Sequence, residues 1–489
     1  MTATVVALNR FGLGARPGDA PPADPRRWLL DQFARFEPRP PALSTAPTTV
    51  AAAADLAALQ DARQQARRGG AMPRQRAMTD PAPRPATPQQ AEAPMSDQER
   101  ALVAARRQGR DNYVESVGAR MNAALVTPAP FVERLVHFWA NHFAVSADGQ
   151  QVVGLAGPLE FEAIRPHVLG RFRDMVFAVE RHPAMLLYLD QAQSVGPNSA
   201  FGQRVAARQD RKVGLNENLA REIMELHTLG VRTGSAQGDV TEFARAMTGW
   251  TVGGIGRGRV RRLTGGTADP GSFLFVPALH EPGARTIMGK SYAEAGEAQA
   301  GAVLDDLIAH PATARHIATK LCRHVIADDP PAAAVARVEA AFVQSGGDLP
   351  AVYRALVAAP EAWAPAPAKF KTPWEWSVSA FRALGIERFG AQQTVGLLQQ
   401  LGQPTWRPGA PAGWDDIAAS WAGPDAIMRR VEAAERFANR AGQQIDARDR
   451  AARLFPGALT PATTQAIARA ESPAQGLALM LVSPEFLRR

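Results

Sequence analysis

The sequence predicts a mainly α-helical protein: one large multi-helix globular body over residues 1–489, with two insertions. One is a small β-hairpin region around 250–290, and the other is a disordered low-complexity stretch around 68–94. The 489 residues are 46% hydrophobic, enough to build a sizeable core. Apolar residues recur at three- and four-residue spacing along most of the chain, with Pro, Gly or Asp at the breaks. The absence of a fixed-period repeat disfavours a solenoid.

The expected helices follow one another with short breaks. The first begins at Asp24-Pro25, a capping residue followed by a proline, and its aromatic residues form one apolar stripe as far as Phe36. The same apolar spacing predicts the remaining helices, at 51–67, 96–121, 131–143, 159–169, 172–181, 183–189, 216–229, 240–248, 293–309, 311–326, 331–345, 349–358, 374–384, 391–401, 424–441, 446–454 and 461–471, with a last short helix before Ser483.

Two stretches depart from this pattern. Residues 68–94 are rich in Gly, Pro, Gln and Arg and have no apolar period, which is typical of a mobile insertion. Residues 249–290 are rich in Gly and Thr and contain the β-like runs Arg259–Leu263 and Ser272–Val276. These runs predict one or two β-hairpins inserted in the helical body.

Composition excludes several classes of protein. The single cysteine, Cys322, excludes an intrachain disulfide and a zinc site built from several thiolates of this chain. No apolar run reaches 18 residues, so we expect a soluble chain without a membrane span. The net charge is +8, and almost all of the basic residues are arginines, as in the proteins of high-GC genomes. The positive charge is therefore only weak evidence for nucleic-acid binding.

The densest group of polar residues lies in the expected helix at 216–229. Asn218, Glu222 and Glu225 are spaced i, i+4 and i+7, so they share one helix face. Two carboxylates one turn apart can hold a metal, or can separate their pKa values so that one acts as acid and the other as base. The structural alternative is an ion pair between Arg221 and Glu225 on a solvated helix.

Three further candidates surround this helix. His227 lies near its C-terminal end, where an imidazolium can interact with free carbonyl groups. Asp190 ends an earlier apolar helix, and it would add a third carboxylate if its loop folded back on this one. His280 lies in a turn after the β-like region, where it either acts as a base or fixes the turn.

A second candidate group lies in the expected helix at 131–143. His137 and Asn141 are one turn apart, whereas His142 follows His137 by five residues, or about 140° of rotation. That spacing is poor for two imidazoles on one metal, so we expect one histidine to point elsewhere. The structural alternative is a core helix whose polar groups bond to neighbouring backbone.

Two weaker features read as helix starts. Thr372, Pro373 and Glu375 have the order of a capping box. The pair Asp328-Asp329 reads as a cap for the helix expected near 331. The sequence contains no phosphate-binding loop, HExxH zinc helix or nucleophile elbow.

The chain resembles the bacterial family called domain of unknown function 1800. The resemblance covers almost the whole chain apart from the low-complexity stretch. It rests on these blocks: ALNRFGLGAR from Ala7, ERLVHFWANHFAVS from Glu133, NENLAREIMELHTLGV from Asn216, DVTEFARAMTGW from Asp239, HEPGARTIMG from His280, KTPWEW from Lys371, Gly402 to Pro404 with Gly413-Trp414, and SPEF from Ser483.

The resemblance implies a mostly helical bacterial protein, often encoded beside a protein of the family called domain of unknown function 1501, which tends to carry a twin-arginine export signal. The sequence departs from the pattern at Ala140, where relatives often have His, and at Glu281, where Asp is common. The missing histidine weakens any three-ligand metal site on that helix. The N-terminus has no secretory signal, which indicates the cytoplasm, with co-export to the periplasm with a partner as the alternative.

Two functions remain open. The first is an enzyme, hydrolytic or metal-assisted, with a buried carboxylate and imidazole cluster; a divalent metal is the cofactor such a cluster could hold. Its candidate catalytic residues are Glu222, Glu225, His142, Asn141 and His137, and its candidate substrate-binding residues are Asn218, Asp190, His227, His280 and Trp250. The second is a non-catalytic partner or scaffold in complex with a protein of the domain of unknown function 1501 family.

Overall fold

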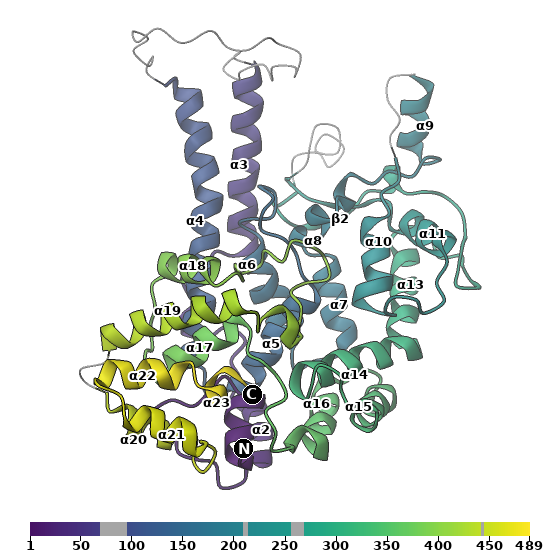
Figure 1. The fold of residues 1–489 in the computed structure, drawn as a ribbon. Coiled ribbons are helices and arrows are strands. Elements are labelled where there is room, and N and C mark those ends of the chain that lie inside the picture. Colours follow the sequence, from purple (N-terminus) through teal and green to yellow (C-terminus); the bar gives the residue numbers. More distant parts are fainter. Residues whose placement is uncertain (69–94, 209–213, 256–267, 442–444) are drawn as a thin grey trace.

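The computed structural model describes residues 1–68, 95–208, 214–255, 268–441 and 445–489. The structure is 62% helical and has two small antiparallel hairpins, which confirms the predicted fold class. Figure 1 shows a helical body from which two long helices, α3 and α4, stand out as an antiparallel pair. In the part of the chain that is described, no helix is both long and apolar enough to cross a membrane.

The first half of the chain contains α-helices interrupted by π- and 3-10 turns. They are α1 (Ala3–Val5), the π-helix η1 (Val6–Phe11), α2 (Pro25–Leu30), η2 (Asp31–Ala34), η3 (Pro41–Leu43), α3 (Thr49–Arg68), α4 (Asp97–Val126), α5 (Pro130–His142), α6 (Ala156–Pro158), the π-helix η4 (Leu159–Ile164), η5 (Arg165–His167), α7 (Phe172–Glu180), α8 (Pro183–Tyr188), η6 (Gln191–Gln193), α9 (Ala200–Ala207), α10 (Asn218–Glu222), the π-helix η7 (Ile223–His227) and α11 (Gln237–Met247). The helices α1 and α9 were not among those expected from the sequence.

The second half is a run of longer helices. They are η8 (Pro277–Leu279), α13 (Glu297–Ala309), α14 (Pro311–Val325), α15 (Ala332–Ser345), α16 (Leu349–Ala358), η9 (Pro360–Trp363), α17 (Pro373–Ala383), α18 (Ala391–Gln400), η10 (Ala418–Ser420), α19 (Pro424–Ala441), α20 (Ala447–Leu454), α21 (Pro461–Ala468), α22 (Pro473–Leu481) and α23 (Pro484–Leu487).

Two hairpins form in the predicted region. β1 (Trp250–Val252) pairs antiparallel with β2 (Phe273–Phe275), and Trp250 lies opposite Phe275. β3 (Arg285–Ile287) pairs with β4 (Lys290–Tyr292). The β-like run predicted at 259–263 and the predicted mobile stretch, beyond its first residue at 68, lie outside the described residues.

Helix starts follow the local sequence in one predicted case and depart from it in another. Thr372 and Glu375 form the predicted capping box of α17, with Pro373 in the first turn. The prediction for Asp328 is wrong, because α15 begins after Pro331 without any side-chain cap. Asp328 instead accepts hydrogen bonds from the Lys369 ammonium and from the backbone N–H of Ala418, so a tertiary contact replaces the local one.

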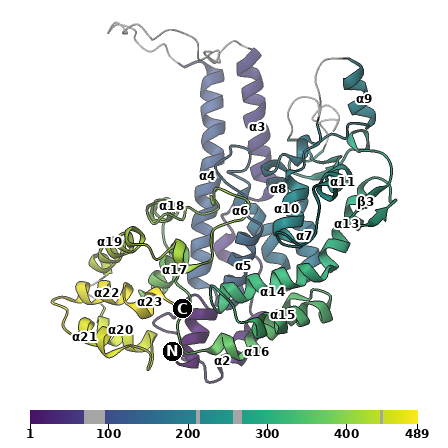
Figure 2. The same cartoon turned by 45° about the vertical axis from the view of Figure 1, so that its right-hand side comes forward.

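Helix α5 is part of the larger of two hydrophobic cores. Its apolar residues belong to a large core that also includes α7, α14 and α16, whereas α17 belongs to a second core formed with the C-terminal helices. Figures 1 and 2 show α5 between α17 on one side and α14 on the other. Every residue of α5 except Asn141 is buried, which explains its nearly continuous apolar sequence.

Candidate functional site

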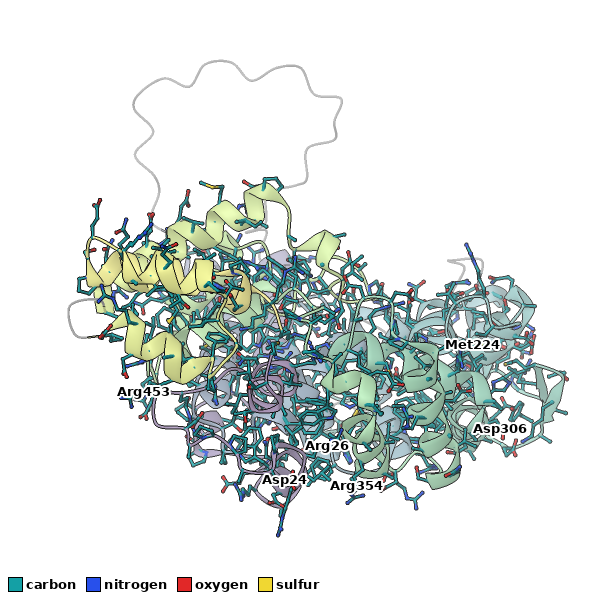
Figure 3. The ribbon with its side chains drawn as sticks, turned by 60° about the horizontal axis from the view of Figure 1, so that its bottom comes forward. Asp24, Arg26, Met224, Asp306, Arg354 and Arg453 are labelled. Atoms are coloured by element: carbon teal, nitrogen blue, oxygen red, sulfur yellow. The ribbon has the colours of Figure 1, made fainter. Side chains whose placement is uncertain are left out.

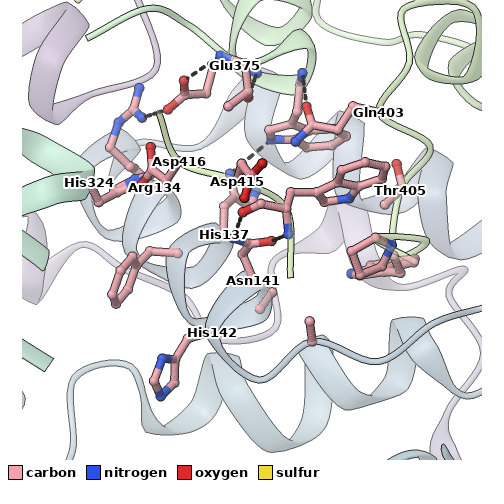
Figure 4. A pocket seen from close by; sticks show the side chains of 18 of the residues that line it. Arg134, His137, Asn141, His142, His324, Glu375, Gln403, Thr405, Asp415 and Asp416 are labelled. Atoms are coloured by element: carbon pink, nitrogen blue, oxygen red, sulfur yellow. Dashed lines mark hydrogen bonds and ion pairs between the residues drawn. The ribbon is translucent and has the colours of Figure 1, made fainter. Parts of the chain in front are cut away.

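A cavity of about 330 Å³ lies where α5, α14 and α17 meet the segment 402–417. We call it the central pocket. Figure 4 shows its lining, which combines aromatic rings with charged and amide side chains. His137, His324, Glu375 and Asp416 are among its polar residues, and Trp414 is among its aromatic ones. Its size and mixed lining are those of a small-molecule site.

Asn141 joins the segment 402–417 to α5. Its side-chain Nδ2 donates to the carbonyl of Trp414 at 2.8 Å, and its Oδ1 accepts from the Trp414 N–H at 2.7 Å. Gly413, with φ of +81°, lies so close that an added Cβ would be 2.3 Å from the Asn141 carbonyl oxygen. The close approach and the positive φ both require glycine at this position.

His324 and Asp416 form a histidine–carboxylate pair at the pocket. The His324 Nδ1 lies 2.6 Å from the Asp416 Oδ2. An ionised carboxylate only accepts, so Nδ1 carries the proton and Nε2 keeps its lone pair. Among the described residues Nε2 has no hydrogen-bond partner, although it is buried, and 13% of the side chain is exposed. This is the arrangement of a general base oriented by a carboxylate.

Two cations stabilise the negative charge of Asp416. Lys369 approaches its Oδ1 at 3.0 Å, and Arg489 lies 3.9 Å away. Burial alone raises the pKa of Asp416, but the pairing with His324, Lys369 and Arg489 outweighs it and keeps the pKa well below its usual value. Burial lowers the pKa of His324 against the opposing effect of Asp416, so the imidazole is neutral at neutral pH.

Two arginines of the pocket are already matched to carboxylates. Arg120 donates through Nε to both oxygens of Glu160, at 2.9 and 2.8 Å. Arg134 donates to Glu375, which also pairs with Arg489 at 2.8 Å. The charges of these two arginines are therefore neutralised by protein carboxylates, and their role in the pocket is structural.

Two cations of α14 are not matched in this way. Lys320 and Arg323 both line the central pocket, and neither forms an ion pair with a carboxylate of the described residues. The Arg323 Nε donates only to the backbone carbonyl of Asp328. Burial lowers the pKa of Lys320 to about 8; Asp416 opposes this shift and Arg323 adds to it. The pocket therefore contains two cations that no carboxylate of the described residues pairs with.

His137 lies in the pocket, but its acceptor nitrogen is already occupied. Trp374 donates from Nε1 to the His137 Nδ1 at 3.2 Å, so the ring proton is on Nε2, which faces Glu133 Oε1 at 3.5 Å. Arg165 also donates to this oxygen, at 2.7 Å. Burial lowers the pKa of His137. This histidine positions Trp374 and has no free lone pair for substrate.

His142 lines the pocket from another direction. Figure 4 shows its ring set apart from His137 and Asn141, as the five-residue spacing leads one to expect. His142 Nε2 donates to the backbone carbonyl of His227 at 3.2 Å. His227 in turn has Nδ1 at 2.8 Å from Glu180, and both of these side chains are fully buried. His142 and His227, both candidate site residues, thus meet through a backbone contact.

The carboxylates predicted for this site do not line the central pocket. Glu225 is 36% exposed and lies 3.9 Å from Arg221, as in the structural alternative. Glu222 is half-buried, and burial raises its pKa. Asn218 is exposed. Figure 3 places Met224 of this segment towards the end of the molecule that carries Asp306, far from the C-terminal helices.

A π-turn explains part of this outcome. The expected continuous helix at 216–229 is α10 followed by the π-helix η7, where the N–H of Thr228 donates to the carbonyl of Ile223. The wider turn adds a residue and breaks the i, i+4, i+7 register assumed for the acidic face. It turns His227 into the core and leaves Glu225 partly exposed.

The three remaining candidates also lie outside the pocket. Asp190 is exposed and accepts from Gln193. His280 Nδ1 donates to the carbonyl of Thr248 at 2.9 Å, which fixes its turn. Trp250 is fully buried against Phe273.

Sequence reasoning missed the pair His324–Asp416. The two residues are 92 positions apart and belong to no recognised motif. One signal was present: Lys320, Arg323 and His324 occur within five residues of one helix that is otherwise apolar on the buried side. Among the described residues, no three His, Cys, Asp or Glu side chains are grouped so that they could hold a metal ion.

The geometry defines a mainly helical protein with a basic small-molecule pocket and a carboxylate-oriented histidine. The family model described as Protein of unknown function (DUF1800) matches residues 6–488, so the chain belongs to that family. Searches of curated proteins and of solved structures found no match.

Proposed function

We propose that the protein is a hydrolytic enzyme in which His324 acts as the general base. The observation that supports this is the His324–Asp416 pair, whose free Nε2 is buried at a cavity large enough for a small molecule. A neutral, desolvated imidazole beside unneutralised cations suits the activation of water. The proposal keeps the hydrolytic chemistry expected from the sequence but moves the base to another helix.

In the proposed reaction, His324 Nε2 takes a proton from water as the water oxygen bonds to the electrophilic atom of an ester. Lys320 and Arg323 stabilise the negative charge that develops on the ester oxygen. The bond to the leaving oxygen then breaks, and the imidazolium returns its proton to that oxygen. Asp416 does not touch the substrate; it is a positioning residue that fixes the tautomer of His324.

Hydrolysis of a panel of p-nitrophenyl esters, including carboxylic and phosphate esters, would test the proposal. His324→Asn should lower turnover by about 100-fold or more. The matched control is His310→Asn, because His310 caps the N-terminus of the same helix and asparagine is a good capping residue. Turnover of no ester in the panel, or full turnover by His324→Asn, would overturn the proposal.

Asp416→Asn separates positioning from a merely structural role. Asp416 raises the pKa of His324, so its removal should move the acid limb of the pH–rate profile to lower pH, besides lowering the rate. A slower enzyme with an unshifted profile would count against the positioning role.

A second candidate function is a non-catalytic role in complex with a protein of the domain of unknown function 1501 family. The feature that favours it is the pair α3–α4, which stands out from the body and carries the exposed residue Val103 near the start of α4. Co-purification of the two proteins would test it: a stable complex that is lost on Val103→Asp supports it, and no complex with the intact chain refutes it.

A further inference from the structure

The central pocket has a charge imbalance that its own carboxylates do not correct. Its lining contains Asp416, Glu375 and Asp415. Asp416 is shared by His324 and Lys369, and Glu375 by two arginines. Asp415 is exposed and accepts from a serine hydroxyl.

Lys320 and Arg323 are the cations left without a described carboxylate, and their position on α14 matters. Lys320 precedes His324 by four residues, so the two side chains lie on the same helix face one turn apart. Arg323 is the immediate neighbour of His324 in the chain. All three residues line the central pocket, so a negative group bound by these cations shares the cavity with the free Nε2 of His324.

The rest of the pocket suits the apolar part of a ligand. Phe138, Trp414 and Ile417 line it, and Ile417 is 36% exposed. Phe138 packs against the His324 ring, with centroids 5.3 Å apart. The buried hydroxyl of Thr405, also in the lining, has no hydrogen-bond partner among the described residues. An anion without an apolar body would leave most of this surface unused.

We propose that the substrate is a small ester that carries an oxyanion, whose carboxylate or phosphate pairs with Lys320 and Arg323 and whose apolar body lies against Phe138 and Trp414. The inference rests on the proposed function, since it assigns the substrate class of that site. Carboxylate and phosphate share the chemistry that an ammonium and a guanidinium recognise.

Isothermal titration of the whole protein with three probes tests this assignment. Benzoate and phenyl phosphate carry the two oxyanions on the same ring, and benzyl alcohol is their neutral counterpart. At least one of the anions should bind ten-fold or more tightly than the alcohol, and its affinity should fall as salt is added. The tighter of the two identifies the group that the site takes.

Variants of α14 assign the effect to the two cations. Lys320→Met and Arg323→Met should each weaken the anion about ten-fold or more. Arg315→Met is the matched control, because it removes a positive charge from the same helix at a surface pair with Glu339 and should change the affinity less than two-fold. A urea titration of each variant shows whether it is folded.

Three results would overturn the inference: equal binding of alcohol and anions, salt-independent binding, or unchanged binding by both folded methionine variants. His324→Asn separates this inference from the proposed function. It should bind the anion as the parent does while losing turnover. If the protein binds the anion through Lys320 but hydrolyses no ester, the oxyanion site is supported and the role of His324 as a general base is refuted.

Discussion

Gly413→Ala should damage the protein more than an ordinary glycine substitution in the same segment. The alanine must adopt the left-handed backbone conformation at φ of +81°, and its Cβ would lie 2.3 Å from the Asn141 carbonyl oxygen. Since α5 is buried on all sides, the segment 402–417 has to move, and the two hydrogen bonds between Asn141 and Trp414 break.

The size of the effect follows from these two losses. The left-handed conformation costs about 1–2 kcal/mol for alanine. Two hydrogen bonds contribute roughly 0.5–1.5 kcal/mol each, so the total loss is about 2–5 kcal/mol in the free energy of unfolding. Gly409→Ala is the matched control, because Gly409 has φ of +77° but no atom within 4 Å of an added Cβ. It should lose only the conformational part.

Urea denaturation of both variants measures the difference, and titration with benzoate shows whether the pocket survives. Gly413→Ala should also weaken the probe, because the displaced segment carries Trp414 and Asp416. Equal losses of stability in the two variants, with benzoate binding intact, would refute the claim that Asn141 and Gly413 hold the pocket wall in place.

Three other outcomes are expected. Burial raises the pKa of Glu133, but Arg165 outweighs this effect and the pKa falls to about 2. The ionised carboxylate therefore stabilises the fold at pH values above its ordinary pKa of 4.5, and this stabilisation is lost as the pH falls towards 2. Glu133→Gln, which leaves Arg165 buried without a carboxylate, should cost about 3–5 kcal/mol at neutral pH and flatten that acid dependence in urea titrations. Benzoate affinity should fall as the pH rises through 8, because burial lowers the pKa of Lys320 to about 8; a flat calorimetric profile would contradict this. Burial raises the pKa of Cys322 to about 12, so the thiol should react with dithionitrobenzoate at pH 8 only after unfolding, and rapid reaction of the native protein would contradict its burial.

Features encoded within one or two helical turns were predictable from the sequence. The capping box at Thr372 and Glu375 depends on residues three apart, and the structure forms it. Likewise, the five-residue spacing of His137 and His142 correctly separated the two rings. The family resemblance added nothing to the geometry, but the family model confirms it over residues 6–488.

Features that depend on tertiary contacts were not predictable in this way. Asp328 looked like a helix cap because only its own neighbourhood was visible, whereas its partners Lys369 and Ala418 lie 41 and 90 residues away. The acidic face of Glu222 and Glu225 assumed a regular helix, and a π-turn has no clear sequence signature. No spacing rule could have paired His324 with Asp416.

Trp414, which lines the pocket, and Asp416, which hydrogen-bonds His324, both lie in the segment 402–417. A substitution that widens the pocket for a bulkier molecule also shifts Asp416, and therefore alters the proton affinity of His324. If the proposed hydrolysis holds, changes of ligand preference should consequently appear together with changes in the pH optimum.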